Sequence, residues 1–213
     1  MKSKVQKKKQ SKVAVLLVNL GTPDQPDKWH VRKYLTEFLN DPLVIDLPWL
    51  IRKFLVNFII IPFRVAKSTA LYKRLWTAEG SPLLVHLVKL QKSLQTALGA
   101  DYQVFAAMRY GKPSIRKTMK LMAESGFSRV VVVPLFPQYA ASTTETVVRK
   151  VKEINQSLSQ PMRLKIVPQF YSEDSFIDAF AEQIKSAGIE QYDHLIMSYH
   201  SLPTRHIERI NPS

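Results

Sequence analysis

His200 is the side chain of this sequence that is best placed for chemistry. It stands just past the apolar run His194–Ser198, from which Tyr199 separates it, and before Ser201-Leu-Pro203, a sequence typical of a rigid turn. An imidazole changes its charge near neutral pH, so it can accept a proton or bind a metal ion. The residues alone leave both roles open. We expect the other histidines to be structural or exposed to solvent: His30, His86, His194 and His206.

Four other apolar runs are also followed by polar and aromatic side chains. Arg109 and Tyr110 come after one of them, and residues 134–144, after another, read Pro-Leu-Phe-Pro-Gln-Tyr-Ala-Ala-Ser-Thr-Thr. In open α/β sheets, ligands bind beyond the carboxyl ends of the strands. We therefore expect one cleft, rimmed by aromatic rings, hydroxyl groups, Arg109 and His200. Such a rim suits a flat, aromatic, partly anionic ligand.

Several common devices for binding cofactors and metals are absent from the sequence. The six glycines, at positions 21, 80, 99, 111, 126 and 188, form no GxGxxG, P-loop or GxSxG motif, and no HExxH motif occurs. There is no cysteine, which excludes disulfides, thiolate zinc sites, iron–sulfur clusters ligated by this chain and a cysteine nucleophile. Nucleotide binding through these motifs is therefore not expected.

The elements that must position these residues alternate between strands and helices. Short apolar runs rich in β-branched residues predict buried parallel strands at Val13–Val18, Val104–Met108, Val130–Val133, Leu164–Val167 and His194–Ser198. Apolar residues at helical spacing predict helices from Ser81-Pro82 to Gly99, Pro113 to Ser125, Thr143 to Leu158 and Ser175 to Ala187. Ser142 and Glu145 predict a capping box at the start of the third helix. This order predicts an α/β fold around a parallel sheet.

Leu43–Phe63 is the longest apolar stretch, with fifteen large apolar residues among 21. Asp46, Arg52 and Lys53 interrupt it, whereas a bilayer span of about 20 residues tolerates few charges. We therefore do not expect a membrane span. Two interpretations stay open: a helix in the core, or a surface helix that touches a membrane through one side formed by Trp49, Leu50, Phe54 and Phe58.

The composition is that of a basic globular protein. The chain has 213 residues, a formal net charge of +14 and 46% hydrophobic residues, which excludes an intrinsically disordered chain. Residues 1–12 carry six lysines and no acid, so we expect a basic disordered tail. Attraction to anionic lipid and non-specific contact with nucleic acid are the alternatives for this tail. No aromatic residue lies among the lysines to stack on a base, so no nucleic-acid partner is expected.

Five motifs, in order and at matching spacing, resemble those of the ferrochelatase family. Residues 194–203, His-Leu-Ile-Met-Ser-Tyr-His-Ser-Leu-Pro, resemble its signature, a hydrophobic strand that ends in Ser-x-His-(Ser/Gly)-hydrophobic-Pro. The other motifs are residues 17–23 (Leu-Val-Asn-Leu-Gly-Thr-Pro), 79–83 (Glu-Gly-Ser-Pro-Leu), 108–111 (Met-Arg-Tyr-Gly) and 135–143 (Leu-Phe-Pro-Gln-Tyr-Ala-Ala-Ser-Thr). The resemblance covers residues 13–213. It is closer to the protoporphyrin enzymes of proteobacteria than to the coproporphyrin enzymes of Gram-positive bacteria.

The resemblance implies insertion of ferrous iron into protoporphyrin IX, which forms haem, with no cofactor beyond the substrate Fe²⁺. It implies that His200 is the catalytic residue and the metal ligand, because the family's histidine binds metal or takes pyrrole protons. The positions that match substrate-binding residues are Arg64, Tyr72, Ser81, Arg109, Tyr110 and Leu20. Leu43–Phe63 matches an apolar lip of the cleft, which touches a membrane in some members.

The resemblance also implies two similar Rossmann-like α/β lobes with the porphyrin between them. We expect the basic tail at residues 1–12, the first lobe at 13–170 and an incomplete second lobe at 171–213, because chains of this family are longer. The remaining part would supply a further histidine and an acidic residue that face His200. Two alternatives stay open: a porphyrin- or haem-binding protein without turnover, and a chelatase for another divalent metal. We expect a cytoplasmic protein, with or without peripheral membrane contact.

Overall fold

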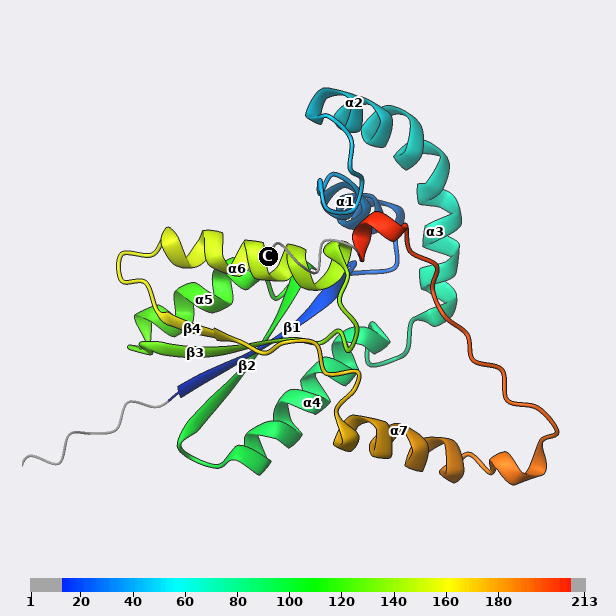
Figure 1. The fold of residues 1–213 in the computed structure, drawn as a ribbon. Coiled ribbons are helices and arrows are strands. Elements are labelled where there is room, and N and C mark those ends of the chain that lie inside the picture. The colour runs from blue at the N-terminus through cyan, green and yellow to red at the C-terminus, as the bar shows by residue number, and fades with distance from the viewer. Residues whose placement is uncertain (1–12, 208–213) are drawn as a thin grey trace, which may run out of the picture.

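A parallel four-stranded sheet forms the centre of the molecule in the computed structural model, which describes residues 13–207 (Figure 1). The strands lie in the order β2-β1-β3-β4. Their bounds are β1 (Val13–Thr22), β2 (Tyr102–Gly111), β3 (Arg129–Pro134) and β4 (Arg163–Ile166). The predicted α/β fold, with a parallel sheet flanked by helices, is confirmed. The predicted tail at residues 1–12 lies outside the described residues.

Helices connect the strands and cover both faces of the sheet (Figure 1). They are α1 (Lys28–Leu39), α2 (Trp49–Phe54), α3 (Ile61–Leu75), α4 (Pro82–Leu98), α5 (Ile115–Glu124), α6 (Thr146–Gln156) and α7 (Asp174–Ser186). Two π-helical segments, η1 (Leu55–Ile60) and η2 (Ala141–Glu145), and two short 3₁₀ turns, η3 (Ile189–Gln191) and η4 (Thr204–His206), complete the described elements. The helix predicted between Ser81 and Gly99 is confirmed as α4, with Pro82 as its first residue.

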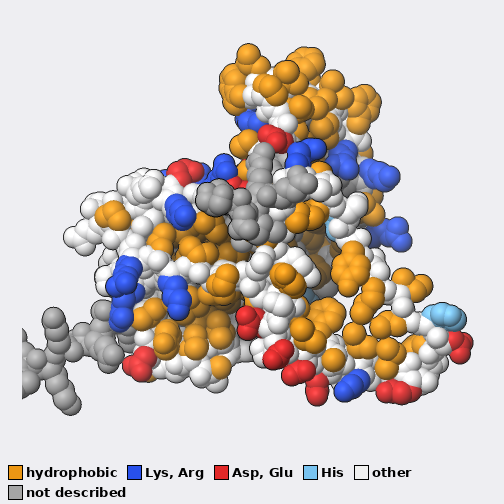
Figure 2. Space-filling view, in the orientation of Figure 1, with side chains coloured by type: hydrophobic (Ala, Val, Ile, Leu, Met, Phe, Trp, Pro, Cys, Tyr) orange, Lys and Arg blue, Asp and Glu red, His pale blue; other side chains and the backbone are white. Residues whose placement is uncertain are grey.

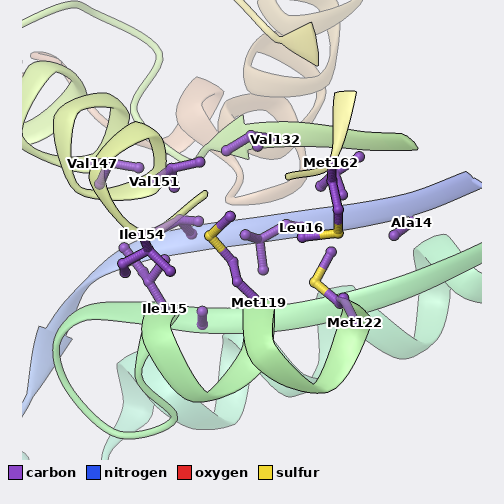
Figure 3. Close-up of a cluster of buried hydrophobic side chains, with 13 residues drawn as sticks. Ala14, Leu16, Ile115, Met119, Met122, Val132, Val147, Val151, Ile154 and Met162 are labelled. Carbon is purple, nitrogen blue, oxygen red and sulfur yellow. The ribbon is translucent and has the colours of Figure 1, made fainter. Parts of the chain in front are cut away.

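The core lies on both faces of β1, because successive side chains of a strand point to opposite faces. Leu16 faces α5 and α6, where it packs in one cluster with the buried Met119 and Val151 (Figure 3). Leu17 faces the other way and packs in a second cluster with Leu87 of α4. The sheet is therefore covered on both sides, as the continuous apolar sequence of β1 predicts.

The helix predicted from Thr143 does not begin with the expected capping box. The π-helical turn η2 precedes α6, and no side-chain capping bond is made at the start of either segment. Instead, the Tyr139 hydroxyl donates to Glu145 Oε2 at 2.9 Å. The predicted capping box of Ser142 and Glu145 is therefore wrong, because Tyr139 and the π-helical turn hold the Glu145 carboxylate elsewhere.

The fifth predicted strand, His194–Ser198, is also wrong. The segment has no regular structure and runs outside the sheet (Figure 1), and the side chain of Ile196 is 86% exposed. A strand needs a neighbour to complete its backbone hydrogen bonds. Within residues 13–207 no strand lies beside this segment, and α7, which precedes it, buries none of its own side chains. The division of the chain at residue 170 stays a prediction.

The apolar stretch Leu43–Phe63 supplies much of a long helix beside α1 (Figure 1). Here α2, η1 and α3 follow one another without a break over Trp49–Leu75, a helix of 27 residues. Among the described residues it is the one helix long and apolar enough to cross a membrane, by length and composition. Val56 and Ile61 are nevertheless buried against α1. The inference that the stretch is not a membrane span stays a prediction.

Candidate functional site

The carboxyl ends of β1 and β2 approach each other closely at Gly21. This glycine pairs with Tyr110 in the parallel ladder, and its φ is +135°. A Cβ atom built on Gly21 would lie 2.1 Å from the carbonyl oxygen of Tyr110, a distance that no side chain tolerates. Only glycine fits both the backbone conformation and the contact. Gly21 therefore sets the position of Arg109 and Tyr110 relative to β1.

Replacing Gly21 with alanine is expected to lower the free energy of unfolding by about 2 kcal/mol or more, because strain and a backbone clash act together. Gly126→Ala is the matched control: its φ is +80°, and a Cβ there meets nothing within 4 Å. We expect this control to cost about 1 kcal/mol, from the backbone conformation alone. Urea denaturation of the two variants measures the difference. Equal losses would contradict the close approach.

Four side chains form a buried polar network at the end of β2. Asp41 Oδ2 accepts hydrogen bonds from Arg109 Nη2 at 2.5 Å, Thr146 Oγ1 at 2.6 Å and Tyr110 Oη at 2.9 Å. Arg109 Nε also donates to Thr146 Oγ1 at 2.7 Å. The ion pair is largely shielded from water, since the side chains of Arg109 and Asp41 are 13% and 5% exposed. The network joins β2, the segment after α1 and the first residue of α6.

The electrostatics of this network favour a charged Asp41. Burial by itself would raise the pKa of this carboxyl group. Hydrogen bonds from Thr146 and from the Leu43 backbone N–H, together with the Arg109 cation, outweigh burial and lower the pKa of Asp41 below its usual value. Burial raises the pKa of Tyr110, so its hydroxyl stays protonated and donates to Asp41. Asp41 and Arg109 thus form an ion pair without net charge, and the network around it fixes the guanidinium of Arg109.

An aromatic cluster adjoins the network between α1, α3 and the end of β2. Tyr34 and Tyr72 meet edge to face with ring centroids 6.2 Å apart, and Phe38 meets Tyr110 in the same way at 5.2 Å. Leu20 packs against this cluster from the end of β1. Because Tyr110 belongs to both the cluster and the network, the structure brings together four of the predicted site residues: Leu20, Tyr72, Arg109 and Tyr110.

Ser81 and Arg64 occupy different surroundings. Ser81 precedes α4, and its buried hydroxyl lies 2.8 Å from Thr22 Oγ1, which ties α4 to the end of β1. Arg64 is exposed on α3, and no ion pair of this side chain is found within residues 13–207. Ser81 is therefore at the edge of the site, whereas Arg64 points to solvent from one of its walls.

His200 belongs to neither the Asp41 network nor the aromatic cluster. It is exposed on the irregular segment after α7, and its Nδ1 lies 2.6 Å from the carbonyl oxygen of Ser201. In the described part of the chain, no three side chains of His, Cys, Asp or Glu are grouped so that they could hold a metal ion. The catalytic and metal-binding roles of His200 stay predictions.

Sequence reasoning missed Asp41 and Thr146. Asp41 follows α1 in a loop that begins Asn40-Asp-Pro42, and Thr146 comes shortly after the run Ser142-Thr-Thr144, from which Glu145 separates it. Neither position is distinguished by periodicity or by a motif. The two residues are 105 positions apart, and only the packing of α6 beside the end of β2 brings them together.

Comparisons with known proteins give the same family over the whole of the described chain. The family model described as Ferrochelatase matches residues 12–212. A protein named Ferrochelatase from Ectopseudomonas mendocina is 42% identical over 200 residues, which are 94% of this chain and 58% of that protein. Proteins with the same name from Coxiella burnetii and Pseudomonas syringae are 42% and 41% identical, again over 94% of this chain. The chain spans 56–58% of the length of these relatives.

Proposed function

Because the chain belongs to the ferrochelatase family, we propose that it takes part in haem synthesis by binding protoporphyrin IX and inserting ferrous iron into it. The observation that carries this proposal is the family match over residues 12–212, which includes every residue of the candidate site. The chain spans 56–58% of the length of its relatives. That this chain by itself turns over substrate is therefore also proposed.

The residue types at the site suit a porphyrin. A flat, apolar macrocycle with carboxylate side chains needs an apolar or aromatic wall and cationic or hydroxyl donors at the rim. Leu20 and Tyr72 would supply the wall, and Arg64 and Ser81 would bind the propionates. Arg109 is held by Asp41 at 2.5 Å, so its guanidinium would face the substrate in one fixed orientation.

The proposed chemistry requires a base, since the porphyrin must lose two N–H protons before it can chelate a dication. In this mechanism the neutral imidazole of His200 accepts a pyrrole proton or holds the incoming iron. His200 is exposed on an irregular segment, so its imidazole is open to a substrate, and the mechanism requires that it face the pyrrole nitrogens. Iron is a substrate here, and no further cofactor is proposed.

The test separates binding from turnover. We expect the purified chain to shift the Soret band of protoporphyrin IX, and we expect Arg64→Gln to weaken binding about tenfold through loss of one charge-assisted contact. Arg74→Gln, also an exposed arginine of α3, is the matched control and should bind as the unmodified chain does. Anaerobic addition of Fe²⁺ then measures haem formation.

Two other outcomes of the same experiment favour the alternatives. Porphyrin binding without haem formation favours a porphyrin- or haem-binding protein without turnover. Insertion of Co²⁺ or Ni²⁺ but not Fe²⁺ favours a chelatase for another divalent metal, since histidine ligands do not select among these ions by affinity alone. Absence of any Soret shift would reject the proposed function.

We also propose a cytoplasmic protein with peripheral membrane contact through an apolar cap, defined as the exposed side chains of Trp49, Leu50, Phe54 and Phe58. These side chains are 61–70% exposed: Trp49 62%, Leu50 70%, Phe54 61% and Phe58 70%. Figure 2 shows a continuous apolar surface at this end of the molecule, with Lys and Arg side chains below it. An exposed apolar surface with basic residues at its border suits an anionic bilayer.

Replacing Phe54 and Phe58 together with serine is expected to lower binding to anionic vesicles at least about tenfold, because two large side chains no longer enter the bilayer. Leu121→Ser, at a leucine of α5 that is 54% exposed, is the control and should bind normally. Vesicle flotation measures the bound fraction. If removal of residues 1–12 abolishes vesicle binding and the phenylalanine variant still binds normally, the contact is assigned to the lysine tail.

A further inference from the structure

A basic hollow opens on the outer side of α1, next to the buried network. Its volume is about 730 Å³, and its lining includes Trp29, Arg32, Lys33, Lys53, Arg109 and Lys150. These residues come from four elements: α1, α2, β2 and α6. Trp29, Arg32 and Lys33 lie on the side of α1 opposite the buried Val31 and Leu35, which pack against the rest of the fold.

Not all of the positive charge in this hollow is balanced. Arg109 is paired with Asp41, and Lys150 donates to both carboxylate oxygens of Glu153, at 2.8 and 2.9 Å. Arg32, Lys33 and Lys53 make no ion pair within residues 13–207.

Two carboxylates line the hollow, and Asp41 is already paired with Arg109. The other, Glu37, offsets part of the remaining charge, and its Oε2 accepts a hydrogen bond from the Gly111 backbone N–H at 3.1 Å. Three unpaired cations against this one carboxylate leave a surplus of two positive charges. The ammonium group of Lys33 lies over the Trp29 ring, with Nζ 5.5 Å from the ring centroid.

We propose that this hollow binds a small soluble polyanion, with at least two negative charges carried on phosphate or carboxylate oxygens. The surplus charge matches such a ligand, and Arg32 offers the planar donor group that binds carboxylate or phosphate through two hydrogen bonds. A volume of about 730 Å³ lies within the range of small-ligand pockets, about 300–1,000 Å³. The exposed ring of Trp29 forms an apolar side of the hollow.

The proposal does not rest on the proposed porphyrin chemistry. Arg109 lines the hollow and is also assigned to the porphyrin, but the residues that carry the proposal, Arg32, Lys33 and Lys53, are not. The double variant leaves Arg109 in place, and binding of a polyanion and binding of a porphyrin are measured separately, so either can fail without the other.

Calorimetric titration of the full chain with tripolyphosphate and, separately, with citrate tests the proposal at low ionic strength, where such contacts are least screened. We expect one or both to bind, and we expect the double variant Arg32→Gln/Lys53→Gln to weaken that binding at least about tenfold. The control, Lys92→Gln/Lys185→Gln, removes the same charge from exposed lysines of α4 and α7. It should bind as the unmodified chain does. Because both double variants keep residues 1–12, any binding by the lysine tail is the same in the two.

The two probes distinguish the chemistry: binding of tripolyphosphate alone assigns phosphate oxygens, and binding of citrate alone assigns carboxylates. Equal weakening in the two double variants would overturn the proposal, because the attraction would then reflect net charge. Binding to phosphatidylglycerol vesicles that depends on Arg32 and Lys53, with no binding of either soluble probe, would also overturn it and assign the hollow to lipid headgroups. Thermal unfolding of each variant checks that the fold is intact.

Discussion

Asp41→Asn is expected to lower the free energy of unfolding by about 3–5 kcal/mol, the scale on which removal of one partner of a buried ion pair destabilises a protein. The amide cannot balance the guanidinium of Arg109, which is 13% exposed and stays buried without a counter-charge. Thr146 and Tyr110 also lose their charged acceptor. Chemical denaturation measures the loss, and the Soret titration then reports whether porphyrin binding depends on an ordered Arg109.

Asp24→Asn is the matched control, since Asp24 pairs with Lys112 at 2.9 Å on the surface, where the Lys112 side chain is 65% exposed. We expect this change to cost less than about 1 kcal/mol. Similar losses in the two variants would show that the Asp41 network does not stabilise the fold.

The pH dependence of unfolding gives an independent check on Asp41. The pKa of Asp41 is lowered in the folded state, so its contribution to stability is fully present above the unfolded value of about 3.9. This contribution is lost as the pH falls through the lower, folded value. The unmodified chain should therefore lose stability more steeply than Asp41→Asn below about pH 4. Parallel pH curves would contradict a lowered pKa.

His200→Ala is expected to lower the rate of iron insertion at least about 100-fold, the scale of a lost general base. The measurement uses a chimera restored to full family length with the part of the Coxiella burnetii relative that this chain does not match, because the chain covers 56% of that protein. Porphyrin affinity should change little, since the wall and rim residues are intact. The expected effect is thus on kcat.

His194→Ala is the control for this prediction, because His194 is an exposed histidine of the same irregular segment. It should leave the rate unchanged. Near-normal turnover in the His200 variant would move the proton transfer to another residue, and a loss of porphyrin affinity equal to the loss of rate would make His200 a binding residue.

The local sequence determined the elements that bury their own apolar faces. The run Val13–Val18 is continuous and β-branched, and it is the strand β1 that is covered on both faces. The apolar spacing after Ser81, with Pro82 first and Gly99 last, determined α4. The five motifs likewise indicated the family, because they are short and lie in continuous sequence.

Tertiary structure decided the features that depend on distant partners. His194–Ser198 has the composition of a strand but forms none, because backbone pairing requires a neighbour that residues 13–207 do not place there. The capping box at Ser142 fails because Tyr139 bonds Glu145 and a π-helical turn intervenes.

The Asp41 network shows the same limit at the candidate site. Arg109 and Tyr110 were predicted as site residues, but their acceptor lies 68 and 69 positions away, in a loop without periodicity. A buried guanidinium requires a carboxylate in contact. Sequence patterns report the neighbours of a residue along the chain, whereas the partner that satisfies a buried charge is chosen by the packing of β2, α6 and the segment after α1.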